Sequence, residues 1–169
     1  ADSVSEDTDA TFFDADADGD LDLYVASGGN EFPSSSSALL DRLYLNDGRG
    51  RFTRDRQPLP SAASFVSSGC VAAADYDGDG DQDLFVGARL QPFLYGVPAN
   101  GYLLVNDGRG QFATLPTSQA PALEKLGMIS DAKWVDVDND QDSDLVVVGE
   151  WTAVEVLLND GGKLTRHTE

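Results

Sequence analysis

Three aspartate-rich segments, repeated at one interval, constrain the fold of this chain more than any other feature of its sequence. They read DADADGDLD from Asp14, DYDGDGDQD from Asp75 and DVDNDQDSD from Asp136. Each start lies 61 residues after the previous one (75 − 14 and 136 − 75). Aspartate occupies every second position, and unscreened like charges ~4 Å apart repel by roughly 4 kcal/mol at an effective dielectric constant of ~20. The chain therefore consists of repeated units, and each unit needs a partner for its negative charge.

Apolar runs of strand-forming residues flank each aspartate segment. ATFFD, VAAAD and AKWVD lead into the segments, and LDLYVAS, QDLFVGA and SDLVVVG follow. Further along each unit, an NDG tripeptide beginning at Asn46, Asn106 or Asn159 separates two more apolar runs. Asn, Asp and Gly tolerate positive φ, so this arrangement predicts a hairpin. One unit thus predicts four short strands, and helical periodicity is nearly absent apart from a connector at 120–128.

The predicted fold class is all-β, with about three four-stranded blades of a β-propeller. A four-stranded unit that cannot bury its own faces suggests that the units stack around an axis. We expect one repeat segment over residues 1–169, with repeats at about 10–56, 69–115 and 131–168. Propellers typically close with 4–8 blades, so the remaining blades are expected from a longer parent chain or from a second copy. The opening ADSVSED, which lacks Met, indicates a mature or excised segment.

The charge balance excludes several kinds of partner. The chain has 30 acidic and 11 basic residues, giving a formal net charge of −19. Nucleic-acid binding needs basic stripes, and attachment to anionic membranes needs basic clusters. No apolar run approaches the ~20 residues that span a bilayer. Cys70 is the single cysteine, so an intrachain disulfide is excluded and we expect a buried, unreactive thiol.

The alternating carboxylates match the ligand preferences of Ca²⁺. Positions 1, 3, 5 and 9 of each segment offer carboxylates and position 7 offers a backbone carbonyl, which suits the ~6–8 oxygen ligands of Ca²⁺. Mg²⁺ demands tighter octahedral geometry, and Zn²⁺ prefers His or Cys, whereas the single histidine is His167, at the far end. About three structural Ca²⁺ ions are therefore expected, each tying a loop between two strands. Gln141 replaces the glycine found at position 6 of the other segments, so the third site is expected to be the least secure.

Two other interpretations of the segments fit less well. An EF-hand loop needs a bidentate Glu at position 12, where this chain has Val25, Val86 and Val147. A solvated acidic surface loop explains neither the shared interval nor the strict alternation.

The three segments resemble the D-x-D-x-D-G-x-x-D-L loops of FG-GAP/VCBS repeats, which are integrin-α-like calcium-binding propeller repeats. FVGAR and LYLNDGRGRF resemble two further stretches of that family, and the resemblance covers essentially the whole chain. It implies a seven-bladed propeller, Ca²⁺ in the blade loops, and an extracellular, cell-surface or periplasmic location. It also implies side-chain ligands at positions 1, 3, 5 and 9 and a carbonyl ligand at position 7. The expected metal residues are Asp14, Asp16, Asp18, Asp20 and Asp22; Asp75, Asp77, Asp79, Asp81 and Asp83; and Asp136, Asp138, Asp140, Asp142 and Asp144.

The expected function is that of a calcium-binding, non-enzymatic propeller segment of a secreted or cell-surface protein, serving adhesion or recognition of a protein or glycan. The alternative is a propeller module of a polysaccharide-acting enzyme such as a lyase. No catalytic residues are expected, because one histidine near the end argues against a Ser-His-Asp arrangement and no carboxylate pair stands out beside the loops. The expected partners include neither nucleic acid nor a membrane span.

Two inserts are candidate contact loops. Residues 28–41 and 87–100 are long, whereas the third unit has only GEWTA at the same place, and longer loops commonly carry binding sites. In the segment PFLYG, Phe93 and Tyr95 are either exposed for contact or packed against a neighbouring blade. Trp134 and Trp151 are expected to be packing residues.

Overall fold

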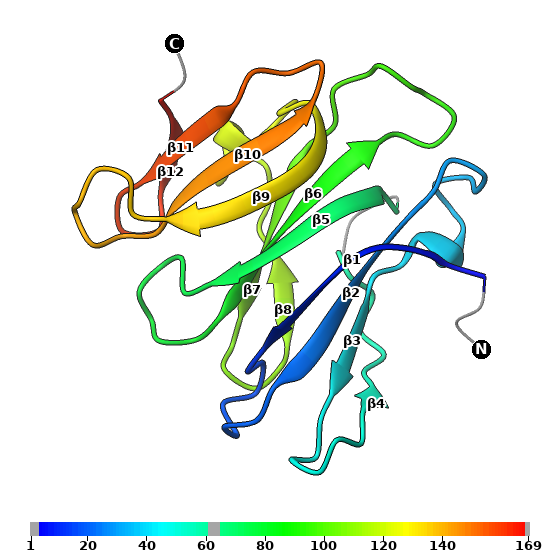
Figure 1. The fold of residues 1–169 in the computed structure, drawn as a ribbon, viewed down its shortest axis with the longest axis vertical. Coiled ribbons are helices and arrows are strands. Elements are labelled where there is room, and N and C mark those ends of the chain that lie inside the picture. Colours follow the sequence, from blue (N-terminus) through cyan, green and yellow to red (C-terminus); the bar gives the residue numbers. More distant parts are fainter. Residues whose placement is uncertain (1–3, 61–64, 168–169) are drawn as a thin grey trace.

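The computed structural model of the chain describes residues 4–60 and 65–167 and contains three four-stranded antiparallel sheets (Figure 1). The first sheet consists of β1 (Glu6–Phe13), β2 (Asp22–Gly28), β3 (Arg42–Leu45) and β4 (Thr53–Arg54). The second consists of β5 (Ser67–Ala74), β6 (Asp83–Leu90), β7 (Gly101–Asn106) and β8 (Phe112–Thr114). The third consists of β9 (Met128–Val135), β10 (Asp144–Glu150), β11 (Glu155–Asn159) and β12 (Leu164–Arg166). The prediction of an all-β chain with four-stranded blades is confirmed, and the described residues form an open array of these blades.

Helical structure is limited to short connectors. Two single-turn 3-10 helices, Ser37–Leu39 and Pro121–Leu123, occur in the described residues, and the second lies within the predicted connector. No helix in the described ranges is long and apolar enough to cross a membrane. The predicted end of the third repeat at residue 168 and the first three residues of ADSVSED lie outside the described residues. The domain boundaries stay a prediction.

Each aspartate segment connects the first two strands of a sheet, and the three connections share one register. Phe13 pairs with Asp22, Ala74 with Asp83 and Val135 with Asp144. The last strand residue before the loop therefore faces position 9 of the segment in every sheet. Because the register is shared, the three loops emerge from equivalent points of equivalent sheets.

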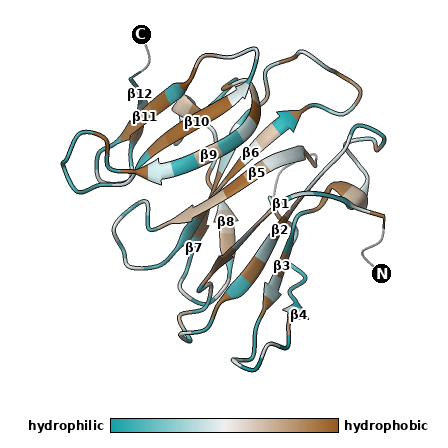
Figure 2. Ribbon diagram, viewed as in Figure 1, coloured by the Kyte–Doolittle hydropathy of each residue, from teal (hydrophilic) through white to brown (hydrophobic). Residues whose placement is uncertain are grey.

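The core lies between the sheets, in two clusters. Hydrophobic residues concentrate along the strands and hydrophilic ones along the loops (Figure 2). Phe13, Tyr24 and Leu43 of the first sheet pack with buried residues of the second sheet in one cluster. The other face of the second sheet packs on the third sheet in the other cluster, with Phe85 and Ile129 fully buried. Each interface between neighbouring sheets is thus a hydrophobic core, which is how blades that cannot bury both faces alone become stable.

Two glycines permit the close approach of neighbouring sheets. A Cβ on Gly69 would lie 2.4 Å from the Ile129 carbonyl oxygen, and one on Gly28 would lie 2.7 Å from the Ser68 carbonyl oxygen. Both obstacles are backbone atoms of the next sheet, which cannot rotate away as a side chain can. Glycine is therefore required where β5 approaches β9 and where β2 approaches β5.

A buried carboxylate lies between the first and second sheets. Asp41 Oδ2 accepts hydrogen bonds from Tyr24 Oη at 2.9 Å and Ser68 Oγ at 3.0 Å, and its Oδ1 accepts one from Ser27 N at 2.7 Å. Burial raises the pKa of Asp41 to about 7, although these hydrogen bonds and the charge of Arg42 act in the opposite direction. Arg42 itself pairs with Asp7. A polar network therefore bridges two sheets through a carboxyl group that titrates near neutral pH.

The single cysteine is part of the second core cluster. Cys70 is buried, as predicted, and burial raises the pKa of its thiol to about 12. A thiol with so high a pKa is protonated at neutral pH and is a poor nucleophile.

Candidate metal centres

The three aspartate loops lie at one end of the sheets, on the left side of the view in Figure 1. The two inserts and the short third connection lie at the opposite end. Position 12 of the segments, occupied by Val25, Val86 and Val147, falls inside β2, β6 and β10. The EF-hand interpretation is therefore wrong, because that position cannot supply a loop ligand.

The fold brings three carboxylates together in each loop. One oxygen from each member of the group lies within 4.8 Å of one oxygen from the others. The groups are Asp14, Asp16 and Asp18; Asp75, Asp77 and Asp83; and Asp136, Asp138 and Asp144. Asp22 of the first loop and the position-5 residues Asp79 and Asp140 are not within these groups. The metal-ligand role of all fifteen aspartates stays a prediction.

Position 9 has a structural role that the sequence did not reveal. Asp22, Asp83 and Asp144 are almost fully buried. In each, one carboxylate oxygen accepts the N–H of position 2 of the same loop, at 2.8, 3.3 and 2.8 Å respectively. The other oxygen accepts the N–H of the NDG asparagine, at 2.8 Å in all three sheets. This carboxylate therefore joins the aspartate loop to the hairpin turn within one blade.

Positions 4 and 6 of each loop adopt left-handed backbone conformations. At position 6, φ is +90° at Gly19, +98° at Gly80 and +82° at Gln141. The expected strain at Gln141 is thus present, because side chains other than Gly seldom adopt this region. Position 4 was not anticipated, and there Ala17 of the first loop has a φ of +60°. The second loop, which has glycine at both positions, is the least strained of the three.

Backbone N–H groups inside the loops orient several of the carboxylates. The N–H of position 6 donates to the position-1 carboxylate at 3.0, 3.0 and 3.1 Å in the three loops. The N–H of position 7 donates to the position-5 carboxylate at 3.0, 2.9 and 2.9 Å. The side chain of Asp142, at position 7, accepts the Gly161 N–H of the NDG turn at 2.8 Å. In the third loop the position-7 side chain is thus hydrogen-bonded to the turn, and its backbone carbonyl is the group that it can offer to an ion.

Several buried carboxylate oxygens have no hydrogen-bond donor among the described residues. They are Asp14 Oδ1, Asp16 Oδ1 and Asp20 Oδ1 in the first loop and Asp77 Oδ1 in the second. Burial, followed by repulsion from neighbouring aspartates, raises the pKa of both Asp16 and Asp77. Burial also raises the pKa of Asp83 to about 6. Anionic oxygens that are desolvated and unpaired are costly, and an all-oxygen donor set of this kind suits a hard divalent cation.

The asparagines of the second and third NDG turns also connect neighbouring blades. Asn106 Nδ2 donates to the Ala15 carbonyl of the first sheet's loop at 2.9 Å, and Asn159 Nδ2 donates to the Tyr76 carbonyl of the second sheet's loop at 2.6 Å. The sequence predicted a turn here but not this contact. Each amide also donates to its own blade, at the Gln82 and Ser143 carbonyls respectively. Position 2 of one loop is therefore fixed by the next blade.

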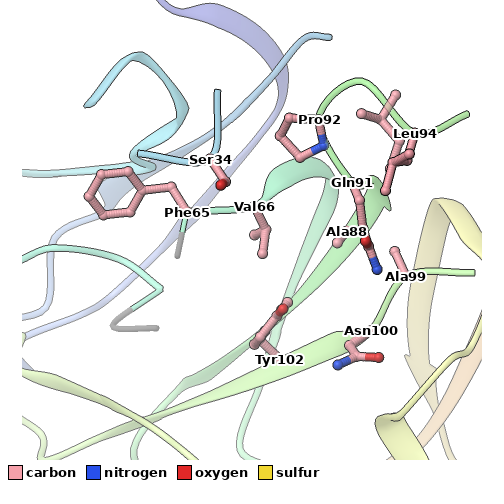
Figure 3. Close-up of a pocket in the computed structure, with 11 residues that line it drawn as sticks. Ser34, Phe65, Val66, Ala88, Gln91, Pro92, Leu94, Ala99, Asn100 and Tyr102 are labelled. Carbon is pink, nitrogen blue, oxygen red and sulfur yellow. The ribbon is translucent and has the colours of Figure 1, made fainter. Parts of the chain in front are cut away.

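The opposite end of the sheets carries a cavity of about 360 Å³ (Figure 3). Its wall comes from the first insert, the second insert, strands β6 and β7, and the two residues before β5. The lining residues are Ser34, Phe65, Val66, Ala88, Leu90, Gln91, Pro92, Leu94, Ala99, Asn100 and Tyr102. None of them is charged. A neutral lining is notable in a chain whose net charge is −19.

Exposed aromatic side chains lie beside this cavity. Phe93 and Tyr95 are both exposed. Tyr95 also contacts the neighbouring blade, where its hydroxyl donates to Glu150 Oε2 at 2.5 Å. Trp151 is 79% exposed, and the expectation that it is a packing residue is wrong. It occupies the short third connection at a φ of +54°, and its ring contacts Tyr95 at 5.3 Å between centroids. Trp134, in contrast, is a packing residue as predicted: it is partly buried against the core and donates through Nε1 to the Ala72 carbonyl at 3.2 Å.

Residues 9–86 match the model of a protein family described as FG-GAP-like repeat. The matched range contains the first two aspartate loops and all or part of the strands on either side of them. The third loop lies outside it and repeats the same hydrogen bonds. A comparison with curated proteins finds no match.

Proposed function

Because the chain is an FG-GAP-like repeat protein, we propose that its three aspartate loops bind Ca²⁺, about one ion each. The observation that carries this proposal is the set of buried carboxylate oxygens in the first two loops that have no donor among the described residues. The third loop is included because it brings together a carboxylate group of the same kind. A bound divalent cation would place a positive charge beside these anionic oxygens. A bound cation would offset both the burial and the mutual repulsion that raise the pKa of Asp16 and Asp77.

The proposed ligands are the carboxylates of positions 1, 3, 5 and 9 and the carbonyl of position 7. Position 9 enters the site already oriented by two backbone N–H groups, which leave further lone pairs of each oxygen free. Positions 1 and 5 are oriented by N–H groups of their own loop. Ca²⁺ accepts such an irregular set of oxygens, whereas Mg²⁺ demands near-ideal octahedral geometry. The ion would hold the first two strands of each blade together at their loop ends.

Calcium titration of the purified chain, followed by isothermal calorimetry and native mass spectrometry, should saturate at three ions per chain, one for each aspartate group. Asp16→Asn, Asp77→Asn and Asp138→Asn should each remove one ion, because each substitution removes a position-3 carboxylate. Asp131→Asn, at a half-exposed aspartate outside the loops, should leave the stoichiometry unchanged. Full stoichiometry in all three loop variants would contradict the assigned sites.

We further propose that the chain is a non-enzymatic recognition module of an extracellular, cell-surface or periplasmic protein, acting in adhesion or in binding a protein or glycan. FG-GAP repeats generally serve as such modules. Support for recognition comes from the insert end: Phe93 and Trp151 are exposed aromatics at positive φ, and strained, exposed residues concentrate at functional sites. The cavity beside them offers amide and hydroxyl groups in a neutral wall, which favours an uncharged glycan.

This recognition function can be tested on an array of neutral and acidic oligosaccharides. We expect binding to neutral glycans that weakens at least several-fold in Trp151→Ala, which loses an exposed ring, and in Tyr102→Phe, which loses only the hydroxyl. Phe52→Ala removes an exposed aromatic at the opposite end of the sheets and should bind like wild type. Binding that is equal in all four proteins, or confined to acidic glycans, would contradict this placement, and release of reducing ends would favour the polysaccharide-acting enzyme.

A further inference from the structure

The residue at position 2 of the first two aspartate loops is held through both its N–H and its carbonyl. Ala15 is fully buried, its N–H donates to Asp22 Oδ2 at 2.8 Å, and its carbonyl accepts Asn106 Nδ2 at 2.9 Å. The second loop repeats this arrangement at Tyr76, whose carbonyl accepts Asn159 Nδ2 at 2.6 Å. Position 2 lies between the proposed ion ligands at positions 1 and 3. Fixing it therefore fixes the backbone from which both of those ligands project.

Both asparagines are in turn held by the aspartate loop of their own blade. The backbone N–H of Asn106 donates to Asp83 Oδ1 at 2.8 Å, and its second amide hydrogen goes to the Gln82 carbonyl at 3.1 Å. Asn159 makes the equivalent bonds to positions 9 and 8 of the third loop, at 2.8 and 3.0 Å. Both asparagines are almost fully buried. A continuous series of hydrogen bonds therefore connects each loop to the loop of the next blade.

The same hairpin turns also approach position 3 of the preceding loop. A Cβ on Gly162 of the third turn would lie 2.9 Å from the Asp77 Cβ. A Cβ on Gly110 of the second turn would lie 3.6 Å from the Asp16 Cβ. Each of these turns therefore meets two adjacent positions of the preceding loop, through a hydrogen bond at position 2 and close approach at position 3.

We propose that Asn106 and Asn159 couple the calcium sites of neighbouring blades, so that an ion in one loop raises the affinity of the adjacent loop. This inference rests on the proposed function of the loops. An ion in the second loop orders positions 8 and 9 of that loop, which hold Asn106, and Asn106 holds position 2 of the first loop. The first loop then binds its ion at a smaller cost in conformational entropy. The coupling is reciprocal, and Asn159 transmits it between the second and third loops.

A site-resolved calcium titration of the full chain, labelled with ¹⁵N, tests this coupling. The amide signals of Gly19, Gly80 and Gln141 report the three loops separately, because each of these N–H groups donates to the position-1 carboxylate of its own loop. Asp77→Asn removes a position-3 ligand from the second loop. It should weaken Ca²⁺ binding in both the first and the third loop, each by about fivefold or more. Asp16→Asn should weaken the second loop in the same way and affect the third loop less.

A second substitution shows whether the asparagine carries the effect. In Asn106→Ala, the influence of Asp77→Asn on the first loop should disappear while its influence on the third loop remains, and Asn159→Ala should give the converse. The matched control is Asn46→Ala, because the Asn46 amide donates, among the described residues, within its own blade, to the Leu21 carbonyl at 3.1 Å. Both influences should persist in that control. The direct electrostatic effect of the lost Asp77 charge is present in every background, so it cancels in the comparison.

Each outcome bears on a different claim. Three ions that bind independently, with Asp77→Asn leaving both neighbouring loops unchanged, would overturn the coupling and leave the ion sites standing. An influence on the first loop that survives in Asn106→Ala would overturn the role of the asparagine. Circular dichroism shows whether Asn106→Ala is folded; if it is not, the ligand variants still decide, because they retain both asparagines. A wild type that binds no calcium would overturn the proposed function and this coupling together.

Discussion

The Asp83→Ala chain is expected to melt well below wild type both in saturating Ca²⁺ and after calcium has been removed from both proteins with EDTA. Asp83 is almost fully buried, and its two oxygens accept the N–H groups of Tyr76 and Asn106. The substitution leaves both backbone donors without this acceptor, and a buried unsatisfied donor costs about 1–3 kcal/mol. A total of roughly 2–6 kcal/mol is expected without any contribution from the ion.

Asp79→Ala is the matched control, because Asp79 is an exposed position-5 residue of the same loop. Its carboxylate accepts one exposed N–H, from Asp81, which water can satisfy after substitution. It should therefore lower the melting temperature in Ca²⁺, where a ligand is lost, and have little effect in EDTA. The melting temperature of wild type itself should fall by several degrees in EDTA. A free Ca²⁺ concentration of about 100 times the dissociation constant stabilises the fold by about 2.7 kcal/mol per site, and this contribution is lost when the ion is removed. Equal melting of Asp83→Ala and wild type in EDTA would show that the position-9 carboxylate has no role beyond the ion.

Asp41→Asn is expected to become more stable than wild type as the pH rises from about 5 to about 8. The folded-state pKa of Asp41 is about 7, against an ordinary value of 3.8, so the fold favours the protonated carboxyl. The stabilising contribution of this group is complete below about pH 4 and is lost as the pH rises through about 7. Asparagine resembles the neutral acid at every pH, so the wild type should lose roughly 1–4 kcal/mol relative to the variant.

The measurement is the free energy of urea unfolding of both proteins at a series of pH values, with Ca²⁺ kept saturating. The aspartate loops are the same in both proteins, so their titration cancels in the difference between the two curves. The free energy of unfolding of Asp131→Asn, a substitution at a half-exposed carboxylate, should change with pH in parallel with that of wild type. A difference between wild type and Asp41→Asn that does not change with pH would show that Asp41 is ionised throughout the range.

The sequence predicted the strands and loops well because their signals are local. Two local signals were enough: aspartates that alternate between apolar runs, and the NDG tripeptides. Each signal needs only a few adjacent residues, and its repetition every 61 residues identified the equivalent elements of all three units. The strained position 6 at Gln141 followed from the same comparison, since Gly19 and Gly80 occupy that place elsewhere. The metal-ligand assignment rests on this pattern as well and awaits the calcium titration.

Contacts between sheets could not be predicted from the sequence. The second role of Asn106, the buried network around Asp41 and the role of Gly69 all depend on how one sheet packs on the next. Residues far apart in the chain meet there, and no local pattern reports the distance between them. Trp151 was misjudged for a related reason: it follows β10 directly, so it resembles a strand residue in sequence, whereas the backbone reverses at it and turns the ring outward.

The bond from an NDG asparagine to the preceding loop, made by Asn106 and Asn159, runs in one direction along the chain. The Ala15 carbonyl receives its amide from a residue 91 positions later, and the Tyr76 carbonyl from one 83 positions later. During translation, a newly emerged loop therefore lacks this clamp until the following hairpin has left the ribosome. The first two loops are therefore completed by protein synthesised after them, so their ordering lags one blade behind the growing end of the polypeptide.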